Sequence, residues 1–293
     1  MQSSWLKLSI SRSMLKLRQH GRKMCTSAAE SQQITPAAAM RWAIGGSSFF
    51  IAENVLLSEY RQCVIELLGD ENRYRLLYGA MSTVASSSIA IGFYRIRGAR
   101  PLRWAVGATP APHHVACFLL QAIGFAGLAQ SLPKLQIPLV TAGGGKQVTP
   151  TPIPGAGAGA NWSVRCPFDF SKPDGLHGVQ RISRHASLWS FASVCLGAAA
   201  VTSSMPQAVC LSMPCMVALI GGAHHDSRAR RSMGTELPPD LDAVTSNVPG
   251  LALLSGAQGG VASVMHALGD EIKWVNAALG AGLAVLLLLR RVR

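Results

Sequence analysis

Charge is scarce in this sequence, and acidic charge is the scarcest. Only 14% of the 293 residues are Asp, Glu, Lys or Arg, and 14 acidic side chains face 27 basic ones. Soluble domains carry about 25% charged residues. Because 49% of the residues are also apolar, this shortage argues against a soluble globular protein and indicates that much of the surface faces lipid.

Metal and nucleotide motifs are missing as well. The seven cysteines include no C-x-x-C pair, so neither a zinc site nor a disulfide framework is predicted. The GGGK run at 143–146 and the GAGAGA run at 155–160 lack the context of phosphate-binding loops. The net charge of +13 comes without a nucleic-acid-binding motif. We therefore expect basic helix flanks that meet membrane lipid, and no nucleic-acid partner.

The first 34 residues have a composition of their own. They are rich in Ser and hold a single acid, Glu30. A basic, Ser-rich, acid-poor leader without a long apolar run predicts an organellar transit peptide, with a plastid favoured and a mitochondrion as the alternative. Its basic residues are Lys7, Arg12, Lys16, Arg18, Arg22 and Lys23.

Apolar stretches of membrane-spanning length recur through the rest of the chain. A spanning helix needs about 17–25 mainly apolar residues. The sequence therefore predicts an all-α polytopic membrane bundle of about six transmembrane helices, in a domain over 35–293. The predicted spans are 42–58, 76–94, 115–132, 186–202, 207–223 and 274–289.

Two connections differ from the predicted spans. Residues 139–175 contain GGG, TPTPIP and GAGAGA, which predict a flexible linker inside the domain. Residues 251–269 are diluted by glycine. We interpret them as an interfacial or re-entrant helix, with a full span as the alternative.

The densest polar cluster is HGVQRISRHASLW at 177–189. If this stretch is helical, His177, Arg181 and His185 share one face, with Arg184 beside them. Such a group at the mouth of a membrane helix suits an anion, such as a lipid phosphate, a haem propionate or a carboxylate of a partner. The alternative is a helix end anchored at the lipid headgroups.

Two further places carry candidate site residues. His224 and His225 end the fifth predicted span, and either imidazole could bind a metal or haem iron. Adjacent histidines on a helix point about 100° apart, so they do not share one metal; a polar helix terminus is the alternative. Glu53 interrupts the first predicted span, and an intramembrane carboxylate is a functional-site candidate unless it reaches the interface.

Five stretches in order resemble the NnrU family of membrane proteins, which includes the plastid 15-cis-ζ-carotene isomerases. The similarity covers most of residues 42–260, and the Arg184–His185 pair is its most specific mark. The stretches are VLLSEYR at 55–61, NRYRLLYGAMS at 72–82, GVQRISRHASLW at 178–189, HDSRARRSMG at 225–234 and TSNVPGLALLSG at 245–256.

For the isomerases, the resemblance implies haem b held by two histidines and a hydrocarbon polyene as substrate. The family's two ligand positions fall here on Asn54 and Ala198, neither of which is a histidine. The resemblance then implies that Arg184 and His185 orient a cofactor or its anionic groups, with Arg181 in support. The substitute ligand candidates are Glu53, His185, His224 and His225.

Two functions follow as expectations. The first is a ζ-carotene-isomerase-like enzyme of carotenoid biosynthesis, with Arg184, His185 and Glu53 as catalytic candidates and a lipophilic small molecule as ligand. The second is a non-catalytic membrane partner of a redox or nitrogen-oxide pathway, which the changed ligand positions favour. A transporter is a weaker third class, because the sequence shows no inverted repeat and few intramembrane charges.

Overall fold

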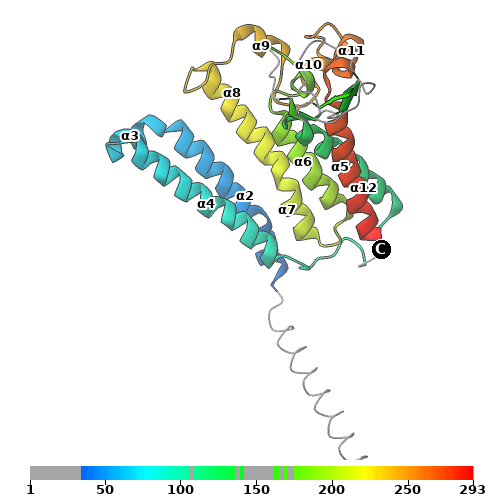
Figure 1. The fold of residues 1–293 in the computed structure, drawn as a ribbon. Helices are drawn as coiled ribbons and strands as arrows, with labels where there is room; N and C mark the ends of the chain where they lie inside the picture. The colour runs from blue at the N-terminus through cyan, green and yellow to red at the C-terminus, as the bar shows by residue number, and fades with distance from the viewer. Residues whose placement is uncertain are drawn as a thin grey trace, which may run out of the picture.

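The structure is a computed structural model that describes residues 34–105, 109–135, 139–141, 162–164, 168–169 and 175–292. The predicted transit peptide, except Ile34, and most of the predicted linker lie outside these residues. Within them the chain is mainly helical (Figure 1). The helices are α2 (Pro36–Glu59), α3 (Arg61–Leu68), α4 (Glu71–Arg95), α5 (Ala111–Gln130), η1 (Gly178–Arg181), α6 (Ala186–Val201), α7 (Met205–Met216), η2 (Val217–Gly221), α8 (Gly222–Arg230), α9 (Pro239–Val244), α10 (Leu251–Leu254), α11 (Val261–Glu271) and α12 (Trp274–Val292).

Four short strands lie at the borders of the predicted linker. β1 (Lys134–Leu135) pairs with β4 (Phe168–Asp169), and β2 (Leu139–Thr141) pairs with β3 (Trp162–Val164), both antiparallel. The two ladders bring the borders of the linker together between α5 and η1.

Three helices of the described chain are long and apolar enough to cross a membrane. They are α4, α5 and the continuous helix formed by α7, η2 and α8. A fourth span results if α11 and α12, which meet at a bend of 92°, count as one. Helix α6 is apolar but has only 16 residues, and α2 contains Glu53 and Asn54. The all-helical membrane architecture is thus supported by three or four spans, whereas six were expected.

The helices form a hairpin that packs on a larger group. Helices α2 and α4 lie side by side, joined through α3, while α5 packs against α6 and α12, and α7 lies between α6 and α2 (Figure 1). Glycine allows the closest approach. A Cβ on Gly46 would lie 2.8 Å from the backbone of Ile89, and one on Gly92 would lie 2.8 Å from the carbonyl oxygen of Trp42. Small residues at such crossings are typical of helix packing in membranes.

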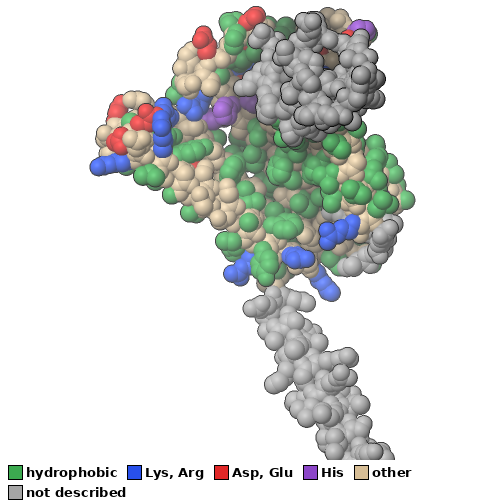
Figure 2. All heavy atoms as spheres, in the orientation of Figure 1, with side chains coloured by type: hydrophobic (Ala, Val, Ile, Leu, Met, Phe, Trp, Pro, Cys, Tyr) green, Lys and Arg blue, Asp and Glu red, His purple; other side chains and the backbone are tan. Residues whose placement is uncertain are grey.

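The two ends of the bundle differ in charge. Figure 2 shows a broad band of hydrophobic side chains, with basic but no acidic side chains below it and both signs above it. At the lower end, Arg95 lies over the ring of Trp42, and Arg103 lies over Trp104 and donates to the carbonyl of Ala199. A band of this kind between two polar ends is the surface expected of a protein in a bilayer.

One predicted local structure needs correction, and a second agrees with the structure. Residues 177–185 are not an α-helix: they form the 3-10 turn η1, with Gly178 at φ 55°, followed by a turn in which His185 caps α6. The predicted single face of His177, Arg181 and His185 therefore does not exist. In 251–269, α10 and α11 are 4 and 11 residues long, so neither is a full span by itself. The sharp bend before α12 agrees with an interfacial or re-entrant segment.

Candidate functional site

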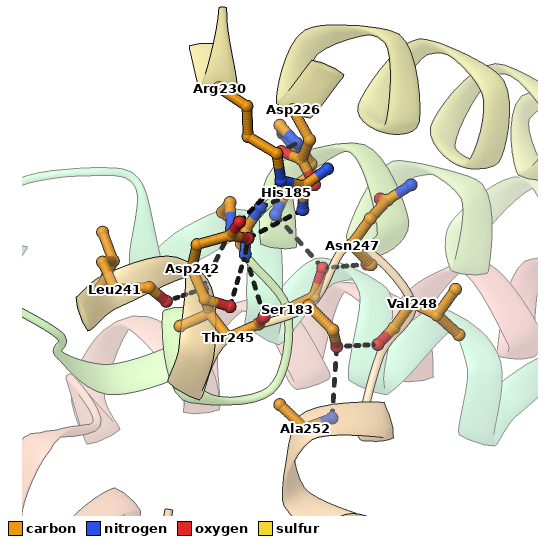
Figure 3. A network of polar contacts seen from close by, with 12 residues as sticks. Ser183, His185, Asp226, Arg230, Leu241, Asp242, Thr245, Asn247, Val248 and Ala252 are labelled. Atoms are coloured by element: carbon orange, nitrogen blue, oxygen red, sulfur yellow. Dashed lines mark hydrogen bonds and ion pairs between the residues drawn. The ribbon is translucent and has the colours of Figure 1, made fainter. Parts of the chain in front are cut away.

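A buried carboxylate, Asp226 of α8, lies at the centre of the upper polar end. Its side chain forms an ion pair with Arg184, with Oδ2 2.8 Å from Nη1, and its Oδ1 lies 2.8 Å from Nε2 of His185 (Figure 3). Asp226 is 5% exposed. The Arg184–His185 pair that marks the family resemblance is thus fixed by one acid that is remote in sequence.

Arg184 has further partners on α9 and on Thr245, the residue that caps its C-terminus. Its Nη2 donates to Oδ1 of Asp242 at 2.7 Å and to the carbonyl of Thr245 at 2.9 Å, and its Nε donates to the Thr245 hydroxyl at 3.0 Å. Two carboxylates therefore neutralise one guanidinium that is only 11% exposed. An anionic ligand could bind Arg184 only by displacing one of these carboxylates. In this structure Arg184 therefore links the start of α6 to α8 and α9.

Asp242 is shared between two arginines. Arg230 donates to both of its oxygens, at 2.6 and 2.8 Å, while Arg184 donates to one of them (Figure 3). The hydrogen bonds from Arg230, followed by that from Arg184, lower the pKa of Asp242 to about 2. The group therefore keeps its negative charge at every physiological pH.

Asn247 joins the same segment to the membrane helices. Its side chain accepts from Nε1 of Trp189 at 3.1 Å and donates to the carbonyl of Leu219 at 2.9 Å, and its backbone carbonyl accepts from the Ser183 hydroxyl at 2.6 Å. The Leu219 carbonyl belongs to η2, a single π-helical turn that follows Pro214. A Cβ on Gly222 would lie 2.4 Å from Oδ1 of Asn247, so a larger residue there would displace the Asn247 side chain from these contacts.

Arg181 belongs to a different cluster from Arg184. It donates to both oxygens of Glu271 at 2.8 and 2.6 Å, and the backbone amide of Gly178 donates to Glu271 at 2.6 Å. Nδ1 of His177 lies 3.8 Å from the same carboxylate. The expected support of Arg184 by Arg181 is therefore absent from this geometry, because each arginine has its own acid.

His224 and His225 point to different parts of the molecule. Nε2 of His224 lies 2.6 Å from the hydroxyl of Ser58 on α2, whereas the ring of His225 lies 6.0 Å from that of His185. This agrees with the expectation that the two do not share one metal. Among the described residues, no group of three or more His, Cys, Asp or Glu side chains could hold a metal ion.

The positions of the histidines bear on haem binding. A two-histidine site needs two imidazoles, each with a nitrogen free for iron. Nε2 of His185 faces Asp226 and that of His224 faces Ser58. At the family's ligand positions, Ala198 has no donor, and Asn54 accepts from the Tyr78 hydroxyl and donates to Glu53. Nε2 of His185 and Nε2 of His224 thus each have a partner already, and neither of the two positions at which the family resemblance implies ligands supplies an imidazole.

Glu53 does not reach the polar surface. It is 5% exposed and lies against α4, where the hydroxyl of Ser82 approaches Oε1 at 3.4 Å. The side chain amide of Asn54 donates to Oε2 at 2.8 Å. The carboxylate is therefore enclosed between α2 and α4 and is not exposed on the surface of the molecule.

An apolar cavity of about 320 Å³ lies below the upper polar end. Helices α5, α6 and α12 form its walls, and Ser183 lies at its border. Four residues of α6 line it, beginning with Ala186, which directly follows His185. The contacts of Arg184 and His185 thus fix the first turns of the helix that forms one wall. The larger apolar side chains around it are Ile123, Ile182, Trp189, Ile272 and Trp274.

The acids that organise this end were not predicted from the sequence. Asp226, Asp242 and Glu271 are three of the 14 acidic residues, and each holds an arginine that the sequence had singled out. Their scarcity was the available signal, because a buried arginine requires an acid. No protein-family model, no curated protein and no solved structure matches the chain.

Proposed function

We propose that the chain is an integral membrane protein of the NnrU type that binds a lipophilic small molecule, with ζ-carotene-isomerase-like action on a polyene as its leading activity. The apolar cavity between α5, α6 and α12 is the observation that carries the proposal. In this proposal α2, α6 and α12 cross the membrane with the three long apolar helices, and the membrane is that of a plastid.

The lining of the cavity supports a hydrocarbon ligand. Apolar and aromatic side chains dominate, with a few hydroxyl and amide groups at the edge. Pockets of this composition favour apolar ligands. At about 320 Å³, the cavity would take one section of a polyene while the remainder lies in lipid. Arg184 and His185 would act as positioning residues, because they hold the start of α6.

Binding can be tested with the purified protein in lipid nanodiscs. Trp189 and Trp274 line the cavity, so a polyene should quench their fluorescence on binding. Ala126→Leu fills the cavity and should weaken binding about tenfold, since overpacking costs about 1–3 kcal/mol. Ala116→Leu, at a partly buried position of the same helix outside the cavity, is the control. Equal affinity in both variants would contradict the proposed site.

Catalysis is tested separately, by chromatography of the isomers formed from 15-cis-ζ-carotene. His185→Ala should lower conversion while membrane insertion remains, because Asp226 and Arg184 still hold each other. Unchanged conversion would remove His185 from the site.

The second candidate is a non-catalytic membrane partner of a redox or nitrogen-oxide pathway. It is favoured by Asn54 and Ala198, which stand at the two ligand positions that the family resemblance implies. A pyridine haemochrome assay distinguishes the two candidates. Protein that stays colourless after expression with ample haem and converts no substrate would support the partner, whereas a stoichiometric b-type spectrum would contradict it.

A further inference from the structure

Glu53 is a buried acid without a basic partner. Its two oxygens are approached by the amide of Asn54 and the hydroxyl of Ser82, both of which are neutral. The ion pairs among the described residues include Glu59, Glu71, Asp226, Asp242, Asp270 and Glu271, and none includes Glu53. Nothing described on the neighbouring helices therefore balances a negative charge at this position.

The elements packed around Glu53 present no cation to it among the described residues. From α4, Tyr78 donates to Asn54 and Tyr74 donates to the carbonyl of Leu57. The α7 and η2 segments that pack on α2 contain no charged residue; their titratable groups are Cys210 and Cys215. Beyond them, His224 faces Ser58, and Arg231 pairs with Glu59.

The depth of Glu53 makes an ionised state costly. Its neighbour Ser82 lies seven residues, or about 10 Å at 1.5 Å per residue, beyond Arg75, after which α4 has no charged residue until Arg95. α4 is long and apolar enough to cross a membrane. A carboxylate that is buried without a cation normally neutralises itself by holding a proton.

We propose that Glu53 is a proton-binding site within the α2–α4 hairpin, occupied at neutral pH. The protonated carboxyl can donate its O–H to the Ser82 hydroxyl, which in turn can donate elsewhere. The site is independent of the cavity between α5, α6 and α12. It provides the hairpin with an acid that can exchange one proton with a molecule at the α2–α4 surface.

A hydrophobic carbodiimide tests the proposal in the intact protein in nanodiscs. The carboxyl proton moves to a carbodiimide nitrogen and the carboxyl oxygen adds to the central carbon. The acyl group then migrates to nitrogen, leaving a stable N-acylurea with no atom lost. A tryptic peptide of residues 42–61 carries both Glu53 and Glu59, so fragment masses assign the label.

Labelling at about pH 6 should be about tenfold greater at Glu53 than at Glu59, which is paired with Arg231. It should decrease as the pH is raised towards about 9. Glu53→Gln should abolish the label, while Glu59→Gln should leave it unchanged. The assignment in the unmodified protein stands even if a variant fails to fold.

Two outcomes would overturn the proposal. One is the absence of label at Glu53 in folded protein at about pH 6, where a protonated buried carboxyl would react. The other is protection by Na⁺ at constant pH, compared with choline, because the occupant would then be a metal cation. A pH dependence that is the same in both salts supports the proton.

Discussion

Two acids are equally buried in this molecule and have opposite surroundings. Asp226 and Glu53 are each 5% exposed, but Asp226 contacts Arg184 and His185, whereas Glu53 contacts only an amide and a hydroxyl. The upper polar end thus retains its charges by pairing them, and the α2–α4 hairpin has no charge partner for its acid. The comparison shows that burial alone does not define a site's chemistry; the partners do.

The largest effect is expected from removing the cation that both aspartates share. Arg184→Met leaves Asp226 without a guanidinium and should lower the free energy of unfolding by about 3–5 kcal/mol, because a buried charge loses its partner. Thermal unfolding in detergent, followed by circular dichroism, measures it. Arg75→Met, at an arginine that is 68% exposed, is the control and should change little. Equal effects would refute the joining role of Arg184.

Neutralising each buried acid sharpens the comparison directly. Asp226→Asn should cost about 2–3 kcal/mol, because the ion pair with Arg184 loses its negative charge and the contact with Nε2 of His185 is weakened. Glu53→Gln should cost less than about 1 kcal/mol, since it resembles a carboxyl that is already neutral. The same unfolding assay ranks the two. A larger loss in Glu53→Gln would mean that Glu53 is ionised.

Acid should weaken the upper polar end selectively. The folded pKa of Asp242 is about 2, below the ordinary value of 3.8. The contribution of Asp242 to the free energy of unfolding is therefore complete above its unfolded pKa. It amounts to about 2 kcal/mol and is lost as the pH falls from about 5 to about 2. A plot of the free energy of unfolding against pH across this range should slope upward in the unmodified protein and have a shallower slope in Asp242→Asn. Identical slopes would exclude Asp242 as its source.

The smallest effect is expected at the exposed link between α8 and α2. Arg231 donates to both oxygens of Glu59 at 2.6 and 2.8 Å, which lowers the pKa of Glu59. Because water screens the pair, Arg231→Ala should lower the midpoint of thermal unfolding only slightly, and by less in high salt. A large loss of stability that does not depend on salt would show that the Arg231–Glu59 pair helps to hold the α2–α4 hairpin against α8.

The helices were more predictable from the sequence than the contacts of the site. Each of the six apolar stretches corresponds to a helix, because the length of an apolar run is a local property of the sequence. Only three or four of these helices are long and apolar enough to cross a membrane. The polar stretch at 177–185 was predicted as one helical face. It is a 3-10 turn instead, because its arginines turn towards Asp226, Asp242 and Glu271, which lie 42 or more residues away.

Glu53 and the histidines show the same limit. The sequence pattern identified Glu53 and the two adjacent histidines as unusual. It did not predict the packing of the α2–α4 hairpin that buries Glu53, or the different directions in which His224 and His225 point. These depend on which helices are neighbours, and a single sequence does not encode that in a local pattern.

The π-helical turn η2 has a consequence for how related chains should be aligned. A π-turn holds one more residue than the α-helical turn it replaces. Deleting one residue between Val217 and Gly221 would restore an unbroken α-helix and rotate everything after it by about 100°. The side chains of His224, His225 and Asp226 would then each point in a new direction, and Asp226 would no longer contact Arg184. The helical phase of this segment is therefore part of the site, and an alignment without a one-residue gap here would compare side chains on different faces.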